Sequence, residues 1–92
     1  MTQRLHVLIA GRVQGVGFRY AVYHLAQTLG LCGWVRNLPD SRVEAVFEGP
    51  RETLDQMLDW CHRGPRLASV TDVTPTWEEA EAPRYDAFHL RM

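Results

Sequence analysis

The residues best suited to chemistry lie in one short segment, Gly11-Arg-Val-Gln-Gly-Val-Gly-Phe-Arg19. Its three glycines fall between an apolar run and a run with helical periodicity. Glycine adopts positive φ readily and lets a backbone come close to a ligand. Backbone N–H groups at such a turn, beside a helix N-terminus, form an anion-binding nest. The guanidinium of Arg19 adds a fork of donors that fits two oxygens of a phosphate. The segment therefore predicts a phosphate cradle closed by one arginine.

Other glycine-rich and ferredoxin-like sites have requirements that this chain does not meet. No Lys-Ser/Thr pair follows the glycines, so the hydroxyl that binds magnesium in a P-loop is missing. The GxGxxG spacing of a dinucleotide fingerprint fails as well. An RNA-binding strand would carry several aromatics, whereas Glu44–Glu48 offers only Phe47 and has acidic neighbours. A copper carrier would need a CxxC pair in the first loop, and the chain has none.

Composition sets the broad class. The chain has 92 residues, 46% of them hydrophobic, and a formal net charge of −1, which favours one globular domain over residues 1–92. The charge balance argues against binding to nucleic acid or to a membrane surface. Cys32 and Cys61 are not paired with histidines at metal-ligand spacing, so we expect no metal. Without a signal peptide or a membrane-spanning run, we expect a cytoplasmic location. We also expect a monomer.

The hydrophobic pattern predicts strands and helices in a specific order. Alternation predicts strands, helical spacing predicts helices, and Gly or Pro marks the boundaries between them. The expected elements are a strand at 5–10, a helix at 18–29, strands at 32–37 and 42–47, a helix at 50–63, a strand at 70–77 and a short strand at 88–92. We expect residues 78–81 to form a solvated connection. This order predicts an α+β fold, the ferredoxin-like βαββαβ sandwich, with an antiparallel sheet of four to five strands and two helices on one face.

That topology brings distant residues together. If the first strand runs up, the helix runs down and the second strand runs up again. The ends of both strands then lie at the same edge of the sheet. We therefore expect the glycine loop, Arg19 and Asn37 to converge there.

The chemistry available at such a site is limited. The inventory consists of backbone N–H groups, the Arg19 guanidinium and the Asn37 amide, with no clear general base and no activated nucleophile. A substrate that is already activated suits it. In an acyl phosphate the leaving group is a carboxylate, whose conjugate acid has a pKa of about 4. The protein would then only hold the phosphoryl group, spread its charge and aim a water in line.

Two segments resemble the signatures of the acylphosphatase family. Gly11–Arg19 resembles the pattern GxVQGVxFR, and Gly33-Trp-Val-Arg-Asn37 resembles the second signature, with Val43 and Gly49 at its expected downstream positions. The resemblance spans essentially the whole chain. It implies a hydrolase that cleaves acyl phosphates to a carboxylate and inorganic phosphate, without metal or cofactor. It also implies that Arg19 is the catalytic phosphate-binding arginine and that Asn37 orients the attacking water. The amides of Gln14, Gly15, Val16, Gly17 and Phe18 would hold the phosphoryl oxygens, and the substrate phosphate itself would accept the water's proton.

One residue departs from the second signature, which usually has glycine where this chain has Ser41. Serine adopts positive φ less readily than glycine, so the shape of that turn is open. Two other functions also stay open. One is a non-catalytic anion-binding or carrier module, since acylphosphatase-like domains occur within larger maturation proteins that handle carbamoyl phosphate. The other is an RNA-binding module. Acetyl phosphate, carbamoyl phosphate and 1,3-bisphosphoglycerate present the same reacting group, so the sequence does not choose among them.

Overall fold

Strand β1 (Gln3–Arg12) alternates buried and partly exposed side chains from Leu5 to Ala10, and its buried face forms part of the core. Leu5, Val7 and Ile9 are fully buried on the face that the two helices cover. The computed structural model describes residues 2–92. The other elements are α1 (Phe18–Thr28), β2 (Cys32–Asn37), β3 (Val43–Gly49), α2 (Arg51–Arg63), β4 (Ser69–Glu79) and β5 (Phe88–Leu90). The predicted strand and helix order is confirmed, and the element boundaries shift by at most a few residues.

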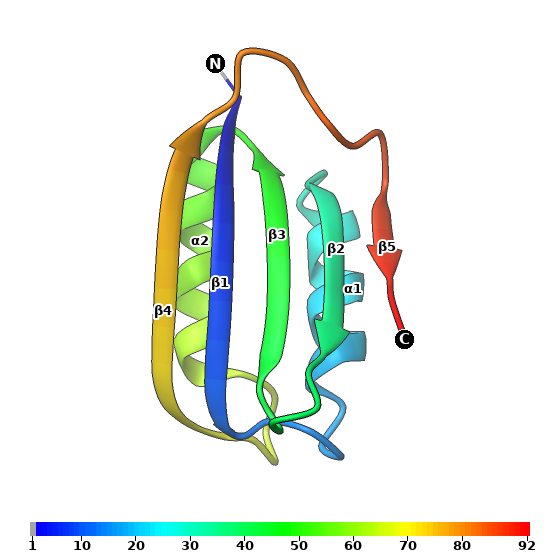
Figure 1. The fold of residues 1–92 in the computed structure, drawn as a ribbon, viewed down its shortest axis with the longest axis vertical. Helices are drawn as coiled ribbons and strands as arrows, with labels where there is room; N and C mark the ends of the chain where they lie inside the picture. The colour runs from blue at the N-terminus through cyan, green and yellow to red at the C-terminus, as the bar shows by residue number, and fades with distance from the viewer. Residues whose placement is uncertain (1) are drawn as a thin grey trace.

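The sheet has the order β4-β1-β3-β2-β5. Strand β1 pairs antiparallel with β3 and β4, and β2 pairs antiparallel with β3. Both helices lie behind this sheet in the view of Figure 1, while the opposite face carries no helix. The ferredoxin-like α+β prediction is therefore confirmed, with its two layers and its helices on one side.

The fifth strand differs from the expected antiparallel arrangement. Strand β5 pairs parallel with β2, with Gly33 opposite Phe88 and Val35 opposite Leu90, so the sheet is mixed. The path of the chain explains the direction. After β4 the chain crosses over one end of the sheet and reaches the far edge, where it can only run back alongside β2 in the same direction (Figure 1).

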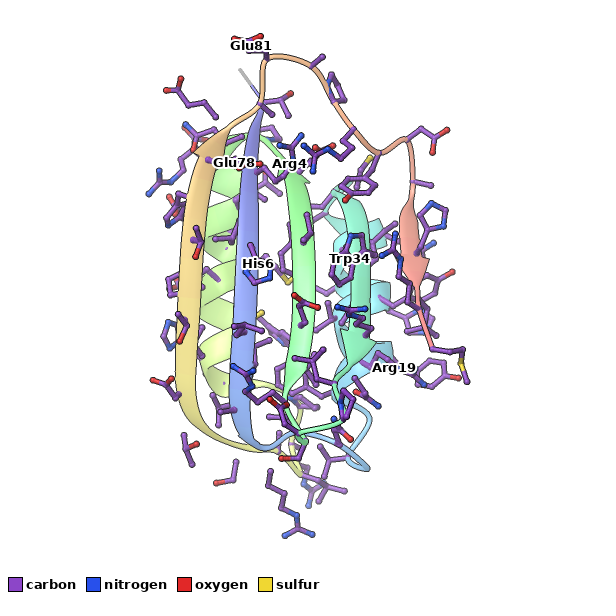
Figure 2. The ribbon with its side chains drawn as sticks, viewed as in Figure 1. Arg4, His6, Arg19, Trp34, Glu78 and Glu81 are labelled. Atoms are coloured by element: carbon purple, nitrogen blue, oxygen red, sulfur yellow. The ribbon has the colours of Figure 1, made fainter. Side chains whose placement is uncertain are left out.

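The connection expected at residues 78–81 is also partly strand. Glu78 and Glu79 end β4, opposite Arg4 and Gln3 of β1. The reason is an ion cluster in which Arg4 binds both Glu48 and Glu78. Figure 2 shows Arg4 and Glu78 side by side at one end of the sheet. Because the carboxylate of Glu78 lies opposite the guanidinium of Arg4, the pairing of β4 with β1 continues through this residue. The acidic composition of residues 78–81 had instead suggested a solvated connection.

No helix among residues 2–92 is both long enough and apolar enough to cross a membrane.

Candidate active site

The glycine segment links β1 to α1 at one end of the sheet. Gly15 and Gly17 adopt φ values of 76° and 81°, in the left-handed region where glycine is favoured. Gly17 is the N-cap of α1 and supplies no side-chain cap to the first turn. Within the described part of the chain, the backbone N–H groups of residues 14–18 donate no hydrogen bond of ordinary length and angle. These donors are therefore available to an anion, beside the positive end of the helix.

Arg19 stands in the first turn of α1 and lines a pocket of about 260 Å³. Its Nη1 donates a hydrogen bond to the carbonyl oxygen of Arg91, at 2.7 Å. Arg91 directly follows β5, so the parallel fifth strand brings a backbone acceptor to the guanidinium. One arm of the fork is occupied by this bond, and the rest of the guanidinium can face an anion.

Asn37 is the last residue of β2 and pairs with Val43 of β3. Its Oδ1 is buried and lacks a hydrogen-bond partner among residues 2–92. Buried polar atoms are almost always paired, so an unpaired acceptor inside a pocket points to a missing donor. A water molecule or a protonated oxygen of a ligand would supply that donor.

The side chain of Gln14 has a different role from its backbone. Its Nε2 donates to the carbonyl oxygens of Leu38 and Arg42, at 2.8 and 2.9 Å. These two carbonyls belong to the turn between β2 and β3, so the glutamine ties the glycine loop to the segment that follows Asn37. In the same turn Ser41 has a φ of 78°. The turn thus keeps positive φ although glycine is absent.

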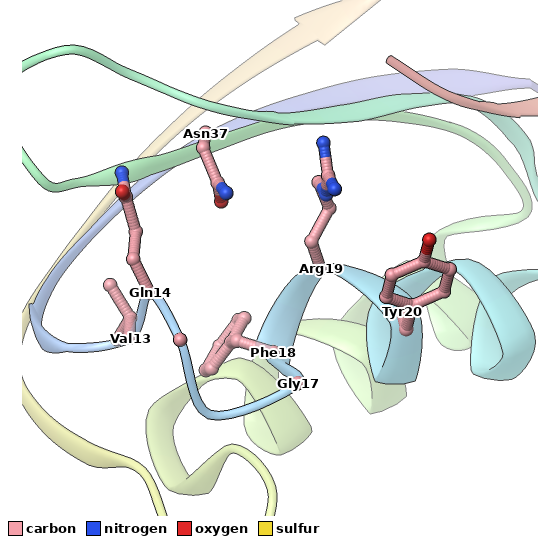
Figure 3. A pocket seen from close by; sticks show the side chains of 8 residues that line it. Val13, Gln14, Gly17, Phe18, Arg19, Tyr20 and Asn37 are labelled. Carbon is pink, nitrogen blue, oxygen red and sulfur yellow. The ribbon is translucent and has the colours of Figure 1, made fainter. Parts of the chain in front are cut away.

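The pocket brings the predicted residues together (Figure 3). It is lined by Val13, Gln14, Gly15, Gly17, Phe18, Arg19, Tyr20 and Asn37. The predicted convergence of the loop, Arg19 and Asn37 at one edge is therefore observed. Val16 is the one loop residue outside this lining, because its side chain packs against the core.

Sequence reasoning did not single out Val13 or Tyr20. Val13 is buried, and Tyr20 is exposed at the pocket. The sequence could have indicated Tyr20. It is an aromatic residue directly after Arg19, and it lies outside the apolar stripe of the helix, so it was not needed for the core.

The lining contains no carboxylate, histidine or thiol. Across residues 2–92, no group of three His, Cys, Asp or Glu side chains is arranged to hold a metal ion. The arrangement can bind an anion through N–H donors and a guanidinium, and it can orient a polar group at Oδ1 of Asn37.

Comparison with known proteins identifies the family. The acylphosphatase family model matches residues 5–90. The chain belongs to the acylphosphatase family. An acylphosphatase of Trichormus variabilis is 59% identical over 81 residues, which cover 88% of this chain and 80% of that protein. An acylphosphatase from Bacillus subtilis, solved as a crystal structure, superposes with a TM-score of 0.92 at 36% identity and covers 100% of both chains.

The likeness extends to part of a larger protein. A crystal structure of full-length HypF, in its phosphate- and nucleotide-bound form, has a TM-score of 0.89 at 27% identity. The match covers 100% of this chain but only 12% of that one. As an acylphosphatase, the chain is an enzyme whose family activity is the hydrolysis of acyl phosphates, as the sequence predicted.

Proposed function

We propose that this acylphosphatase hydrolyses its substrate with the phosphoryl group held by Arg19 and by the backbone N–H groups of residues 14–18. Asn37 orients the attacking water through Oδ1. The observation that carries this proposal is the unpaired, buried Oδ1 of Asn37, which lines the same pocket as Arg19 and the glycine loop. Donors fixed in advance around a developing charge are the most effective electrostatic catalysts, because they need no reorganisation during the reaction.

The proposed reaction is an in-line displacement at phosphorus. The water oxygen forms a bond to phosphorus while the bond from phosphorus to the acyl oxygen breaks. The acyl oxygen leaves with the electron pair as a carboxylate, and its low basicity means that no protein acid must protonate it. The proton of the water passes to a phosphoryl oxygen, since the pocket is lined by no carboxylate, histidine or thiol that could accept it. The products are a carboxylate and dihydrogen phosphate.

The loop N–H groups and Arg19 contact different parts of the negatively charged phosphoryl group. The loop donors surround the phosphoryl oxygens from the backbone side, and the space beside Gly15 and Gly17 is open, since a Cβ at either position would meet no atom within 4 Å. Arg19 reaches over the pocket, and its bond to the Arg91 carbonyl limits the positions that the guanidinium can take. A fixed guanidinium loses less entropy when it binds two phosphoryl oxygens than a freely rotating one.

Release of inorganic phosphate from acetyl phosphate, measured with a metal chelator present, tests this assignment. Arg19→Ala should nearly abolish turnover, and Asn37→Ala should lower kcat about 10²–10³-fold, as expected for the loss of one oriented polar group. Arg66→Ala is the matched control, because Arg66 is exposed and does not line the pocket. Turnover that survives both substitutions in folded protein would contradict these roles.

The likeness to one segment of HypF supports a second candidate, an anion-binding module without turnover. The same assay separates the two functions, because this module would bind inorganic phosphate in a titration and release none from acetyl phosphate. The expectations of a monomer and of a cytoplasmic location remain predictions, and gel filtration of the purified chain tests the first.

A further inference from the structure

Two exposed apolar side chains adjoin the guanidinium that lines the pocket. Tyr20 is 55% exposed and Met92 is 97% exposed. Among residues 2–92 only one other large apolar side chain, Leu67, is exposed to a comparable degree. Scattered exposed apolar residues are ordinary and require no explanation. Here, however, two of the three contact the same cation.

Both side chains lie beside the guanidinium of Arg19. The Cζ of Arg19 lies 5.6 Å from the centre of the Tyr20 ring, within the range of a cation–π contact. The sulfur of Met92 lies 3.9 Å from Nη1 of the same guanidinium. Tyr20 itself lines the pocket. A group bound to the anion that Arg19 holds would therefore emerge beside an aromatic ring and a thioether.

The direction of attack indicates which part of the substrate reaches them. In an in-line displacement, the attacking water and the leaving group lie on opposite sides of phosphorus. Asn37, which would orient the water, and Tyr20 lie on opposite sides of Arg19 in the close view of the pocket (Figure 3). The leaving acyl group would thus point away from Asn37, toward Tyr20.

We propose that Tyr20, together with Met92, contacts the acyl group and gives this enzyme a preference for acyl phosphates with apolar, above all aromatic, acyl groups. This proposal rests on the phosphoryl and water positions of the proposed function. An aromatic acyl group would stack on the Tyr20 ring or contact the Met92 thioether, whereas an acetyl group is too small to cover either surface. A carbamoyl group is also small, and it would leave its polar N–H groups beside an apolar surface.

The test is the ratio of kcat/KM for benzoyl phosphate to kcat/KM for acetyl phosphate. Comparing this ratio between variants removes the intrinsic difference in reactivity between the two substrates. Tyr20→Ala should lower the ratio about three- to tenfold, which is the worth of one aromatic contact. Tyr20→Phe should keep it, because the ring remains. Met92→Ala should lower it less than Tyr20→Ala, since a thioether contact is weaker.

Leu67→Ala is the matched control, because Leu67 is also an exposed apolar side chain but lies outside the pocket. Its ratio should equal that of the wild type. An equal loss on both substrates in Tyr20→Ala would show that Tyr20 only positions Arg19, and an unchanged ratio would show no contact with the acyl group. Either result overturns the proposal. If the wild type hydrolyses neither substrate, the proposed function itself fails, and this outcome is distinct from the other two.

Discussion

Gln14 and Leu38 join the two halves of the pocket, since Nε2 of the glutamine donates to the leucine carbonyl oxygen at 2.8 Å. Leu38 directly follows Asn37, and the same Nε2 also reaches the carbonyl oxygen of Arg42 across the turn. The glycine loop and the segment that carries Asn37 are therefore held at a fixed separation by one side chain. In the proposed mechanism, this separation sets the distance between the phosphoryl group at the loop and the water at Asn37.

Replacing Gln14 with Glu should damage this link. The carboxylate has no donor for the two carbonyl oxygens and repels them, so the loss should lower the free energy of unfolding by about 1–3 kcal/mol. It should also lower kcat, because Asn37 loses its fixed distance from the loop. Urea unfolding and phosphate release from acetyl phosphate measure the two effects. Gln56→Glu, on the exposed side of α2, adds the same charge away from the pocket and should change neither quantity. A Gln14→Glu protein as stable and active as the Gln56→Glu protein would refute this role.

The turn after β2 holds a serine in a conformation that favours glycine. Ser41 has a φ of 78° and is exposed, so its side chain gains little from packing to offset the strain. Ser41→Gly should therefore raise the free energy of unfolding by about 1 kcal/mol. Thermal unfolding and urea unfolding both measure this. Ser69→Gly makes the same change within β4, where φ is not positive, and should destabilise the protein instead. A loss of stability in both variants would mean that the Ser41 side chain is needed.

The sequence predicted those features that follow from local pattern and from chain direction. Alternation in Leu5, Val7 and Ile9 placed β1 in the core, and the direction of the first two strands placed Arg19 and Asn37 at one edge. The family signatures then predicted the activity. These inferences succeeded because each depends on a repeat or a spacing that is visible along the chain.

Features set by long-range contacts were not predictable in this way. The parallel direction of β5 depends on a crossing over the end of the sheet, and nothing in the three residues Phe88–Leu90 encodes their partner strand. Glu78 looked like part of a solvated acidic stretch because its partner, Arg4, is 74 positions away. The bond from Gln14 to the turn was hidden for the same reason, since its side chain could equally have faced the ligand.

The crossing between β4 and β5 depends on a buried ion pair. Glu48 is 3% exposed and accepts hydrogen bonds from Nε of Arg4 and from the backbone N–H groups of Arg84 and Tyr85. One carboxylate thus joins β1, β3 and the crossing segment that leads to β5. Since Arg91 directly follows β5 and accepts a hydrogen bond from Arg19, this distant cluster also supports the position of the Arg19 guanidinium.

Removing one partner of this pair should be strongly destabilising. Glu48→Ala removes the buried partner of Arg4, so that only the exposed carboxylate of Glu78 remains beside this charge, and it leaves two backbone N–H groups without their acceptor. It should lower the free energy of unfolding by about 3–5 kcal/mol. Arg4→Ala should be comparably severe. The double variant should lose clearly less stability than the sum of the two single losses, because each single substitution already removes the contact between Arg4 and Glu48. Strict additivity in urea unfolding would show that the two groups do not interact.

The thiol of Cys61 should make the protein less stable as the pH rises into the alkaline range. It is fully buried in α2, and burial raises its pKa from the usual 9.0 to about 12. Below pH 9 the thiol is protonated in the folded and unfolded states alike, so it does not penalise folding. Between pH 9 and 12 the unfolded state alone loses the proton, so the free energy of unfolding falls by about 1.4 kcal/mol per pH unit. Wild-type protein should therefore lose about 2 kcal/mol more than Cys61→Ala when urea unfolding is compared at pH 8 and pH 10.5.

Cys32 provides the internal comparison. It is only half-buried, and its pKa is raised by burial and by the charges of Glu48 and Asp86. The free energy of unfolding falls between pH 8 and pH 10.5, and Cys32→Ala should reduce this fall less than Cys61→Ala does. Cys61→Ala also opens a cavity, which lowers the free energy of unfolding. This cost is the same at pH 8 and at pH 10.5, so it cancels when the two pH values are compared. Parallel stability curves for wild type and Cys61→Ala would show that the thiol ionises as easily in the folded protein as in the unfolded chain, which a fully buried side chain should not allow.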